Sequence, residues 1–383
     1  MLAFIMPTRD RQAELDRTLD AVGRLGLGPS EAEVVIADNA SRESPRAPGT
    51  LANGLKVTLL RRGSNEGAAA RTAAALEVDA SRKWLVMLDD DSAPVESGSS
   101  LIELLESQPS GVGAVMADIH LPLQGKRESG GLPEVPVGCG VAYRREAYLH
   151  AGGYDPLFNY YAEEYDLSAK LLLAGWRVAF EPTWRVEHRK VETGRDMNVI
   201  LGRLVRNNGW VMARYAPASV RGRMLDETIE RYGRIAKKEG AVEGYRRGLI
   251  ELQRTLDSQP RDEMDEPTWD RFTGLAAARE AIGWALAERA FESASIVSPG
   301  KNEWAVRRAL EEAGVEVHEG VAGRGDVLVV GTMSPGPMLD ARKMLEPLGR
   351  RVVLPWIGAS RLIPSFERPE VHAVKRRSRS GAA

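Results

Sequence analysis

Three consecutive carboxylates, those of Asp89, Asp90 and Asp91, directly follow the apolar run from Trp84 to Leu88. Adjacent carboxylates repel one another unless a cation or strong hydrogen-bond donors compensate their charge. Oxygen ligands of this kind suit Mg²⁺ or Mn²⁺, which commonly bridge one or two carboxylates to substrate phosphates. The triplet therefore indicates a site for a divalent ion and a phosphorylated ligand. The alternative is a solvated turn in which an aspartate caps the next helix.

Other polar residues follow the predicted strands or begin a predicted helix. They are Pro7, Thr8 and Arg9 in "MPTRDR", Asp38 and Asn39 in "ADNAS", and Asn65, Gly67 and Arg71 in "NEGAAARTAA". A glycine and small residues at a helix start offer free backbone N–H groups and close approach to a ligand. Each cluster alone could equally be turn chemistry or helix capping.

Acidic residues begin another predicted helix, in "EEYDLSAKLLLAG". Apolar residues follow at helical spacing and Gly175 is a natural end, so Glu163, Glu164 and Asp166 lie at the helix N-terminus. The helix dipole favours acids there by about 0.3–1 kcal/mol each. The functional alternative is a general base in a cleft.

A histidine, His188, follows the predicted strand "WRVAF". A lone histidine is more often structural or exposed than functional, although imidazole is also a common metal ligand.

These residues need a scaffold, and residues 1 to about 182 alternate β-rich runs with helical patterns, which predicts an α/β fold with a mostly parallel sheet. The predicted strands cover residues 2–6, 33–38, 56–60, 84–88, 112–117 and 176–180, and the helices between them include residues 13–25, 67–80 and 99–107. The apolar runs are continuous, as expected of strands buried on both faces. Most of the polar clusters follow a strand, and open α/β sheets bind ligands at the carboxyl ends of their strands.

The β signal disappears after the first part of the chain and later returns. We predict an α/β domain over 1–195, a helical segment over 196–290 and a small α/β domain over 291–370. The polar, basic residues 371–383 are predicted to be disordered.

The composition is that of an ordinary globular protein, with 43% hydrophobic residues, 28% charged residues and a net charge of −2. A nucleic-acid binder would normally carry a net basic field. Cys139 is the single cysteine, which excludes a disulfide within the chain and a multi-thiolate zinc site. No apolar run approaches the roughly 18 residues of a membrane span. We expect a cytoplasmic protein without a transmembrane segment. A homo-oligomer is compatible with the sequence.

In their order along the chain, the motifs resemble those of the family 2 inverting glycosyltransferases, which have the GT-A fold. The resemblance covers about residues 1–190 and rests on "MPTRDR", "VVIADNAS", "NEGAAAR", "VMLDDDSAP", "GCGVAYRREAYLHAGGYDPLF", "EEYDL" and "RVEHR". It implies a metal-dependent, hexosyltransferase-like enzyme using Mn²⁺ or Mg²⁺. Such an enzyme moves a sugar from a nucleotide-diphosphate sugar to a hydroxyl of a saccharide, glycolipid or small metabolite.

The resemblance also implies roles for individual residues. The DXD motif matches Asp89 to Asp91, and the metal ligands would be Asp91, Asp89 and His188. The donor-binding residues would be Pro7, Thr8, Arg9, Asp38, Asn39, Asn65, Gly67, Arg71, Asp89, Asp90 and Gly140. The catalytic group would comprise Glu164, Glu163 and Asp166. Here the family's usual Glu-Asp pair is Glu163-Glu164, and we predict Glu164 as the base, with Glu163 the alternative.

Two other functions are alternatives to this one. A sugar-phosphate nucleotidyltransferase would carry a glycine-rich, basic loop after the first strand, and "MPTRDRQAEL" contains no glycine. A non-catalytic nucleotide-sugar-binding protein would not need the complete acidic triplet, the acidic helix start and the histidine.

Overall fold

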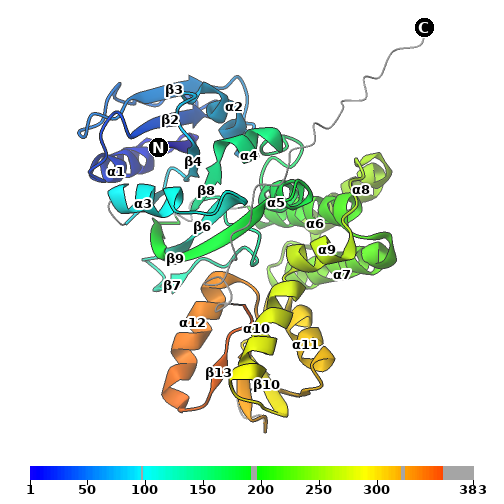
Figure 1. The fold of residues 1–383 in the computed structure, drawn as a ribbon. Helices are drawn as coiled ribbons and strands as arrows, with labels where there is room; N and C mark the ends of the chain where they lie inside the picture. Colours follow the sequence, from blue (N-terminus) through cyan, green and yellow to red (C-terminus); the bar gives the residue numbers. More distant parts are fainter. Residues whose placement is uncertain (96–97, 191–195, 321–323, 357–383) are drawn as a thin grey trace.

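The computed structural model describes residues 1–95, 98–190, 196–320 and 324–356. Its largest feature is a nine-stranded sheet in the order β3-β2-β1-β4-β8-β6-β9-β5, with β7 beside β6 (Figure 1). The strands are β1 (Leu2–Thr8), β2 (Ala32–Asp38), β3 (Val57–Arg61), β4 (Trp84–Met87), β5 (Ser92–Pro94), β6 (Val112–Leu121), β7 (Lys126–Arg127), β8 (Val141–Arg144) and β9 (Arg177–His188).

The first four of these strands are parallel, whereas β8 runs antiparallel between β4 and β6. The predicted strand at residues 176–180 extends to His188, because β9 stays paired with β6 beyond a register shift at Ala117/Asp118. The short strand β5 pairs antiparallel with the end of β9, with Ser92 opposite His188. This pairing brings the triplet before β5 next to the histidine.

Alternate residues of β1 enter two separate apolar cores, as the period of a strand requires. Leu2, Phe4 and Met6 pack with α1 (Gln12–Gly23) and α3 (Gly98–Glu106). Ala3 and Ile5 pack on the other face with α2 (Ala70–Glu77), α4 (Arg145–His150) and α5 (Glu163–Leu173). Both faces of the sheet are therefore covered, which explains the continuous apolar runs.

The middle of the chain is helical, as predicted. Its helices are α6 (Met197–Tyr215), α7 (Ala218–Lys238), α8 (Val242–Thr255), α9 (Glu266–Thr273) and α10 (Leu275–Glu288). At the crossing of α6 and α8, a Cβ on Gly248 would overlap the backbone of Gly202, so glycine allows the two helices to approach closely. In the part of the chain that the structure describes, no helix combines the length and the apolar character needed to cross a membrane.

The last described part is a second, parallel sheet in the order β11-β10-β12-β13. It comprises β10 (Ser293–Val297), β11 (Glu316–Glu319), β12 (Val327–Val330) and β13 (Val352–Val353), with helices α11 (Glu303–Glu312) and α12 (Pro335–Leu345). The fold class is thus the predicted one. The predicted disordered tail lies outside the described residues.

One apolar core joins all three parts of the chain. It contains Met116 and Phe180 of the large sheet, Trp210 of α6, Phe272 of α9 and Val329 of β12. The domain boundaries at 195 and 290 remain predictions, and this core is not divided at either of them.

A buried ionic network holds α5 against the end of α6. Nη1 of Arg214 donates to Asp166 at 2.8 Å and to Asp155 at 2.7 Å, and the hydroxyl of Tyr215 donates to Asp166 at 2.7 Å. Both Arg214 and Asp166 are buried. Removing one partner would leave an uncompensated buried charge.

We expect Asp166→Ala to lower the free energy of unfolding by about 3–5 kcal/mol, because Arg214 would lose a buried counter-charge. Urea denaturation followed by tryptophan fluorescence measures this loss. The control is Glu227→Ala, which breaks an exposed pair with Arg223 on α7 and should cost no more than about 0.5 kcal/mol. Equal losses in the two variants would show that the network does not stabilise the junction.

Candidate active site

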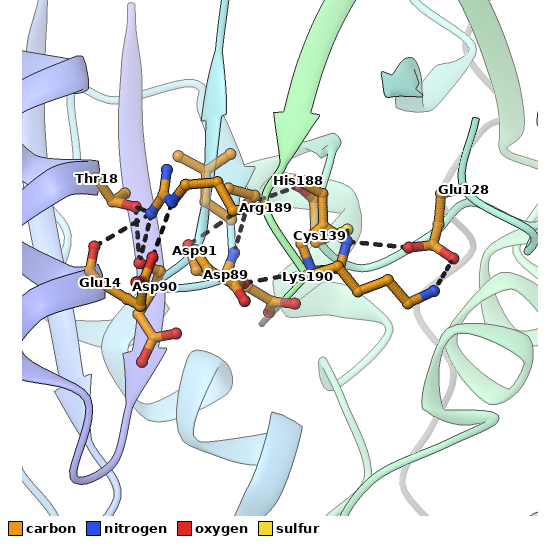
Figure 2. A network of polar contacts seen from close by, with 12 residues as sticks. Glu14, Thr18, Asp89, Asp90, Asp91, Glu128, Cys139, His188, Arg189 and Lys190 are labelled. Carbon is orange, nitrogen blue, oxygen red and sulfur yellow. Dashed lines mark hydrogen bonds and ion pairs between the residues drawn. The ribbon is translucent and has the colours of Figure 1, made fainter. Parts of the chain in front are cut away.

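The triplet lies where the carboxyl end of β4 meets β5 and the end of β9 (Figure 2). Asp90 points back into the sheet. The hydroxyl of Thr8 donates to its Oδ2 at 2.8 Å, and Nη1 of Arg11 lies 2.8 Å from its Oδ1. Burial raises the pKa of Asp90 to about 7, and Arg11 and Thr8 oppose that rise.

Asp91 lies between two cations. Its Oδ2 is 2.5 Å from Nη2 of Arg11, and its Oδ1 is 3.3 Å from Nε2 of His188. Burial opposes ionisation of Asp91, but His188 and Arg11 outweigh it and hold the pKa well below its usual range. The charge of Asp91 is therefore compensated within the protein.

His188 continues this network on its other side. Its Nδ1 lies 3.0 Å from Glu128 and 3.6 Å from the sulfur of Cys139, and Lys190 lies 2.6 Å from Glu128. Burial opposes protonation of His188, but Cys139, Asp91 and Glu128 together outweigh it and raise the pKa above its usual range. Burial also opposes ionisation of Glu128, but His188 and Lys190 lower its pKa to about 2.

The backbone of the triplet is also held in place. Thr18 on α1 donates to the carbonyl of Asp90 at 2.7 Å, and Arg189 donates to Glu14 at 2.9 Å and to Thr18 at 2.6 Å. The amide of Arg189 donates to the carbonyl of Asp91 at 2.9 Å. Helix α1, the triplet and the end of β9 thus form one connected unit (Figure 2).

Asp89 is the member of the triplet that remains accessible. Its side chain is 36% exposed, whereas those of Asp90 and Asp91 are 4% exposed. Arg71 of α2, which is buried, donates to the carboxylate of Asp89 and to the carbonyl of Leu88. Asp89, the first of the three acids, is therefore the one that is accessible to a ligand.

Asp89 lines a cavity of about 460 Å³ together with His188, Glu163 and Glu164. Oε1 of Glu164 accepts from the amide of Gly138 at 3.1 Å, while the buried Oε2 of Glu163 accepts no hydrogen bond from the described residues. Burial raises the pKa of both carboxyls, and for Glu163 the charge of Glu164 adds to the rise. A raised pKa makes a carboxylate a better proton acceptor.

Three residues before α5 have left-handed backbone conformations, namely Asn159, Tyr161 and Ala162, with φ of 60°, 74° and 66°. Such conformations are uncommon outside glycine and often occur at functional sites. Gly67 packs directly against Asn159, where any Cβ would overlap its carbonyl group. The glycine of "NEGAAAR" thus makes room for the turn that leads into the two glutamates.

The predicted donor residues at the ends of β1 and β2 lie on the same side of the sheet but outside this cavity. Asn39 donates to the carbonyl of Gly67 at 3.0 Å, and Asn65 accepts from the amide of Gly67 at 3.1 Å. Asp38 accepts from the amide of Ser41 at 2.9 Å. These side chains order the loops around the sheet edge. Pro7 is buried in β1, and Arg9 is exposed beside Asp10.

Two predicted residues lie away from the cavity. The carboxylate of Asp166 is occupied by Arg214 and Tyr215 at the α5–α6 junction, so its contacts are structural. Gly140 is buried where a Cβ would contact Ile119 and Val186. Its neighbours Gly138 and Cys139 line the cavity instead.

A divalent ion fits this site at Asp89, and His188 can add a ligand nitrogen only after it loses a proton, because Asp91 and Glu128 occupy its two ring nitrogens. Ligand atoms of Asp89, Cys139 and His188 all lie within 4.8 Å of one another. Carboxylate oxygen and imidazole nitrogen suit Mn²⁺, and oxygen suits Mg²⁺. The third predicted ligand, Asp91, is next to His188 but is occupied by Arg11.

Sequence reasoning missed Arg11, Glu128, Arg189 and Lys190, all of which hold the network. Arg11 and Arg189 do stand in the quoted stretches "MPTRDR" and "RVEHR", and Lys190 directly follows the second. Basic residues three positions after Thr8 and two after His188 were therefore a usable signal. Glu128 had no such signal in the sequence, because it lies in the loop after β7, outside the quoted motifs.

Residues 3–122 match the sequence model of glycosyl transferase family 2. This part of the chain is therefore similar to that family, and the predicted resemblance is confirmed over these residues. The match includes the triplet and ends before Gly138, the two glutamates of α5 and His188.

Solved structures of glycosyltransferases are similar at low identity. The mannosyltransferase PcManGT from Pyrobaculum calidifontis, in complex with GDP-Man and Mn²⁺, is 18% identical over 75% of this chain and 80% of that chain, with a TM-score of 0.44. TarS 1–349 of S. aureus in complex with UDP-GlcNAc is 13% identical over 82% and 92% of the two chains, with a TM-score of 0.46. At these TM-scores the likeness is too distant to argue from. No curated protein matches the sequence.

We expect Asp91→Asn to lower the free energy of unfolding by about 3 kcal/mol, because Arg11 and His188 would lose a buried counter-charge. Urea denaturation at neutral pH measures the loss. Asp16→Asn, on the exposed side of α1, is the matched control and should change it by less than about 0.5 kcal/mol. Unchanged stability in Asp91→Asn would contradict the compensation of its charge by Arg11 and His188.

Proposed function

We propose that the protein is a metal-dependent inverting glycosyltransferase that moves a sugar from a nucleotide-diphosphate sugar to an acceptor hydroxyl. The observation that carries the proposal is the cavity beside β4. One accessible carboxylate of the triplet, His188, the buried Glu163 and the half-buried Glu164 line it together, in a chain whose residues 3–122 match glycosyl transferase family 2.

The donor side of the site comprises the ends of β1, β2 and β4. Asp89, joined by His188 once its imidazole has lost a proton, would hold Mn²⁺ or Mg²⁺, and such an ion neutralises the charge that develops on a leaving diphosphate. Arg71 keeps Asp89 directed toward the cavity. Asn39 and Asn65 fix the glycine loop at Gly67, beside the expected nucleotide.

The acceptor side is the N-terminus of α5. We assign the general base to Glu164, whose Oε1 is oriented by the amide of Gly138. It would take the proton of the acceptor hydroxyl while the oxygen attacks the anomeric carbon from the face opposite the diphosphate. Glu163 lies beside it, and its charge state is coupled to that of Glu164 by repulsion between the two carboxylates.

The nucleotidyltransferase alternative has no observation in its favour, since the loop after β1 directs Arg11 into the triplet. A non-catalytic binding protein would not require two neighbouring glutamates with raised pKa values in the cavity. Carboxyl groups perturbed in this way cluster at functional sites.

The proposal predicts that the protein releases nucleoside diphosphate from at least one common UDP- or GDP-sugar when Mn²⁺ is present. Thermal shift with donor and Mn²⁺ should identify the donor first, because a ligand of the folded state raises its stability by mass action. Asp89→Asn should lose both the shift and the release, while its amide oxygen can still accept from Arg71. Thermal shift without release for every donor would support the non-catalytic alternative.

The base assignment predicts that Glu164→Gln retains donor binding but lowers single-turnover transfer or hydrolysis by about 10²–10⁴-fold, because an amide cannot accept the proton. Glu163→Gln is the matched control and should keep most of the rate. The rate of the wild type should rise with pH through a pKa above that of an ordinary glutamate, because the base must lose its proton first. If the Glu163→Gln variant is slow and the Glu164→Gln variant is fast, the general base is Glu163 and the assignment to Glu164 is wrong.

A further inference from the structure

The catalytic cavity continues toward the C-terminal part of the chain. A second cavity of about 560 Å³ lies between α7 and the start of α11, and it shares Arg231, Tyr232 and Lys301 with the first. These three residues therefore stand between the glutamates of α5 and an outer groove. The groove is formed by parts of the chain that the family 2 match does not reach.

Lys301 is held in this position by its backbone. Ser298, three residues before Lys301, and Asn302, directly after it, have left-handed conformations, with φ of 50° and 54°. The amide of Met333 donates to the carbonyl of Lys301 at 2.9 Å, and the side chain of Asn302 donates to the carbonyl of Thr273 at 2.8 Å. The loop is thus tied to the turn after β12 and to the end of α9.

The side chain of Lys301 reaches the acceptor side of the site. Its ammonium group donates to the hydroxyl of Tyr165 at 2.8 Å and lies 5.3 Å from the centre of that ring. Tyr165 directly follows Glu164 in α5. A residue of the C-terminal part is therefore connected through one side chain to the proposed base.

Two half-buried cations in this region lack a carboxylate partner among the described residues. Among residues 1–95, 98–190, 196–320 and 324–356, neither Lys301 nor Arg231 forms an ion pair, and Arg231 stacks on Tyr232 with 4.9 Å between its guanidinium carbon and the ring centre. Both side chains are half-buried. A cation that is partly removed from water without a counter-charge is costly, and a bound anion offsets that cost.

The acids that line the two cavities do not supply the missing charge. Asp89 pairs with Arg71, Glu128 with Lys190, Glu227 with Arg223 and Glu303 with Arg307. Burial raises the pKa of Glu163 and Glu164, the charge of Glu164 raises that of Glu163 further, and Glu230 is exposed.

We propose that Lys301 and Arg231 bind a phosphate group carried by the acceptor. The proposal rests on the proposed function, since it assigns the acceptor side of the same site. A guanidinium fork and an ammonium group together suit a phosphate. The donor's diphosphate is expected at Asp89 and His188, whereas α7 and α11 lie away from β2 and β3 (Figure 1). The acceptor is thus a phosphorylated molecule that carries its reacting hydroxyl toward Glu164.

Inorganic phosphate is the probe, titrated into the full chain by isothermal calorimetry without donor. Lys301→Gln and Arg231→Gln should each weaken its binding at least tenfold, and Lys301→Arg should restore most of the affinity. Lys238→Gln removes an exposed cation from the same helix α7 and is the matched control, expected to change the affinity less than twofold. Circular dichroism checks that each variant is folded. If Lys301→Gln is unfolded, the phosphate affinity of Arg231→Gln tests the proposal.

Unchanged phosphate affinity in both glutamine variants would overturn the proposal. UDP and GDP form the second arm of the experiment. If these variants weaken nucleoside-diphosphate binding as much as phosphate binding, the pair belongs to the donor, and the acceptor assignment is wrong. The assay contains no sugar donor and measures no turnover. The phosphate-binding result can therefore be interpreted even if the protein proves not to be a glycosyltransferase.

Discussion

Compensation of three adjacent carboxylates at the end of a buried strand is the constraint on which the site depends. Two unit charges about 4 Å apart near a protein surface interact by about 4 kcal/mol, so three acids cannot remain ionised side by side without partners. The chain supplies them from separate elements. Arg71 comes from α2, Arg11 from the loop before α1 and His188 from the end of β9. The antiparallel pairing of β5 with β9 makes the last of these contacts possible.

This compensation gives the three acids different tasks. Asp90 and Asp91 are buried and join the end of β4 to α1 and β9, whereas Asp89 faces the cavity. The prediction from sequence placed the principal metal ligand at Asp91, by resemblance to the family motif. Its position between Arg11 and His188 instead favours Asp89 as the residue that meets a ligand, with His188 as its neighbour.

Much of the sheet could be predicted from the sequence, because parallel strands buried on both faces leave continuous apolar runs. The same pattern predicted that the triplet lies at the carboxyl end of a buried strand, at the edge of the sheet. The antiparallel strands could not be predicted: β5 is three residues long and β8 four, too short to show a period. Asp166 and Glu164 stand in one acidic motif, yet helical geometry turns Asp166 toward Arg214, a partner 48 residues away. Lys301 lies 136 residues from Tyr165 and had no local signal at all.

The central claim is a single displacement of a nucleoside diphosphate from a sugar bound beside Asp89, with Glu164 activating the attacking hydroxyl. The configuration of the first product tests it most directly. Time-resolved proton NMR can follow the sugar released from a nucleotide α-hexose in the presence of Mn²⁺, with water as the acceptor. The account predicts that the β-anomer appears first and then mutarotates. The α-anomer as the first product would contradict it, because retention requires a double displacement or a front-side attack instead of the proposed single displacement.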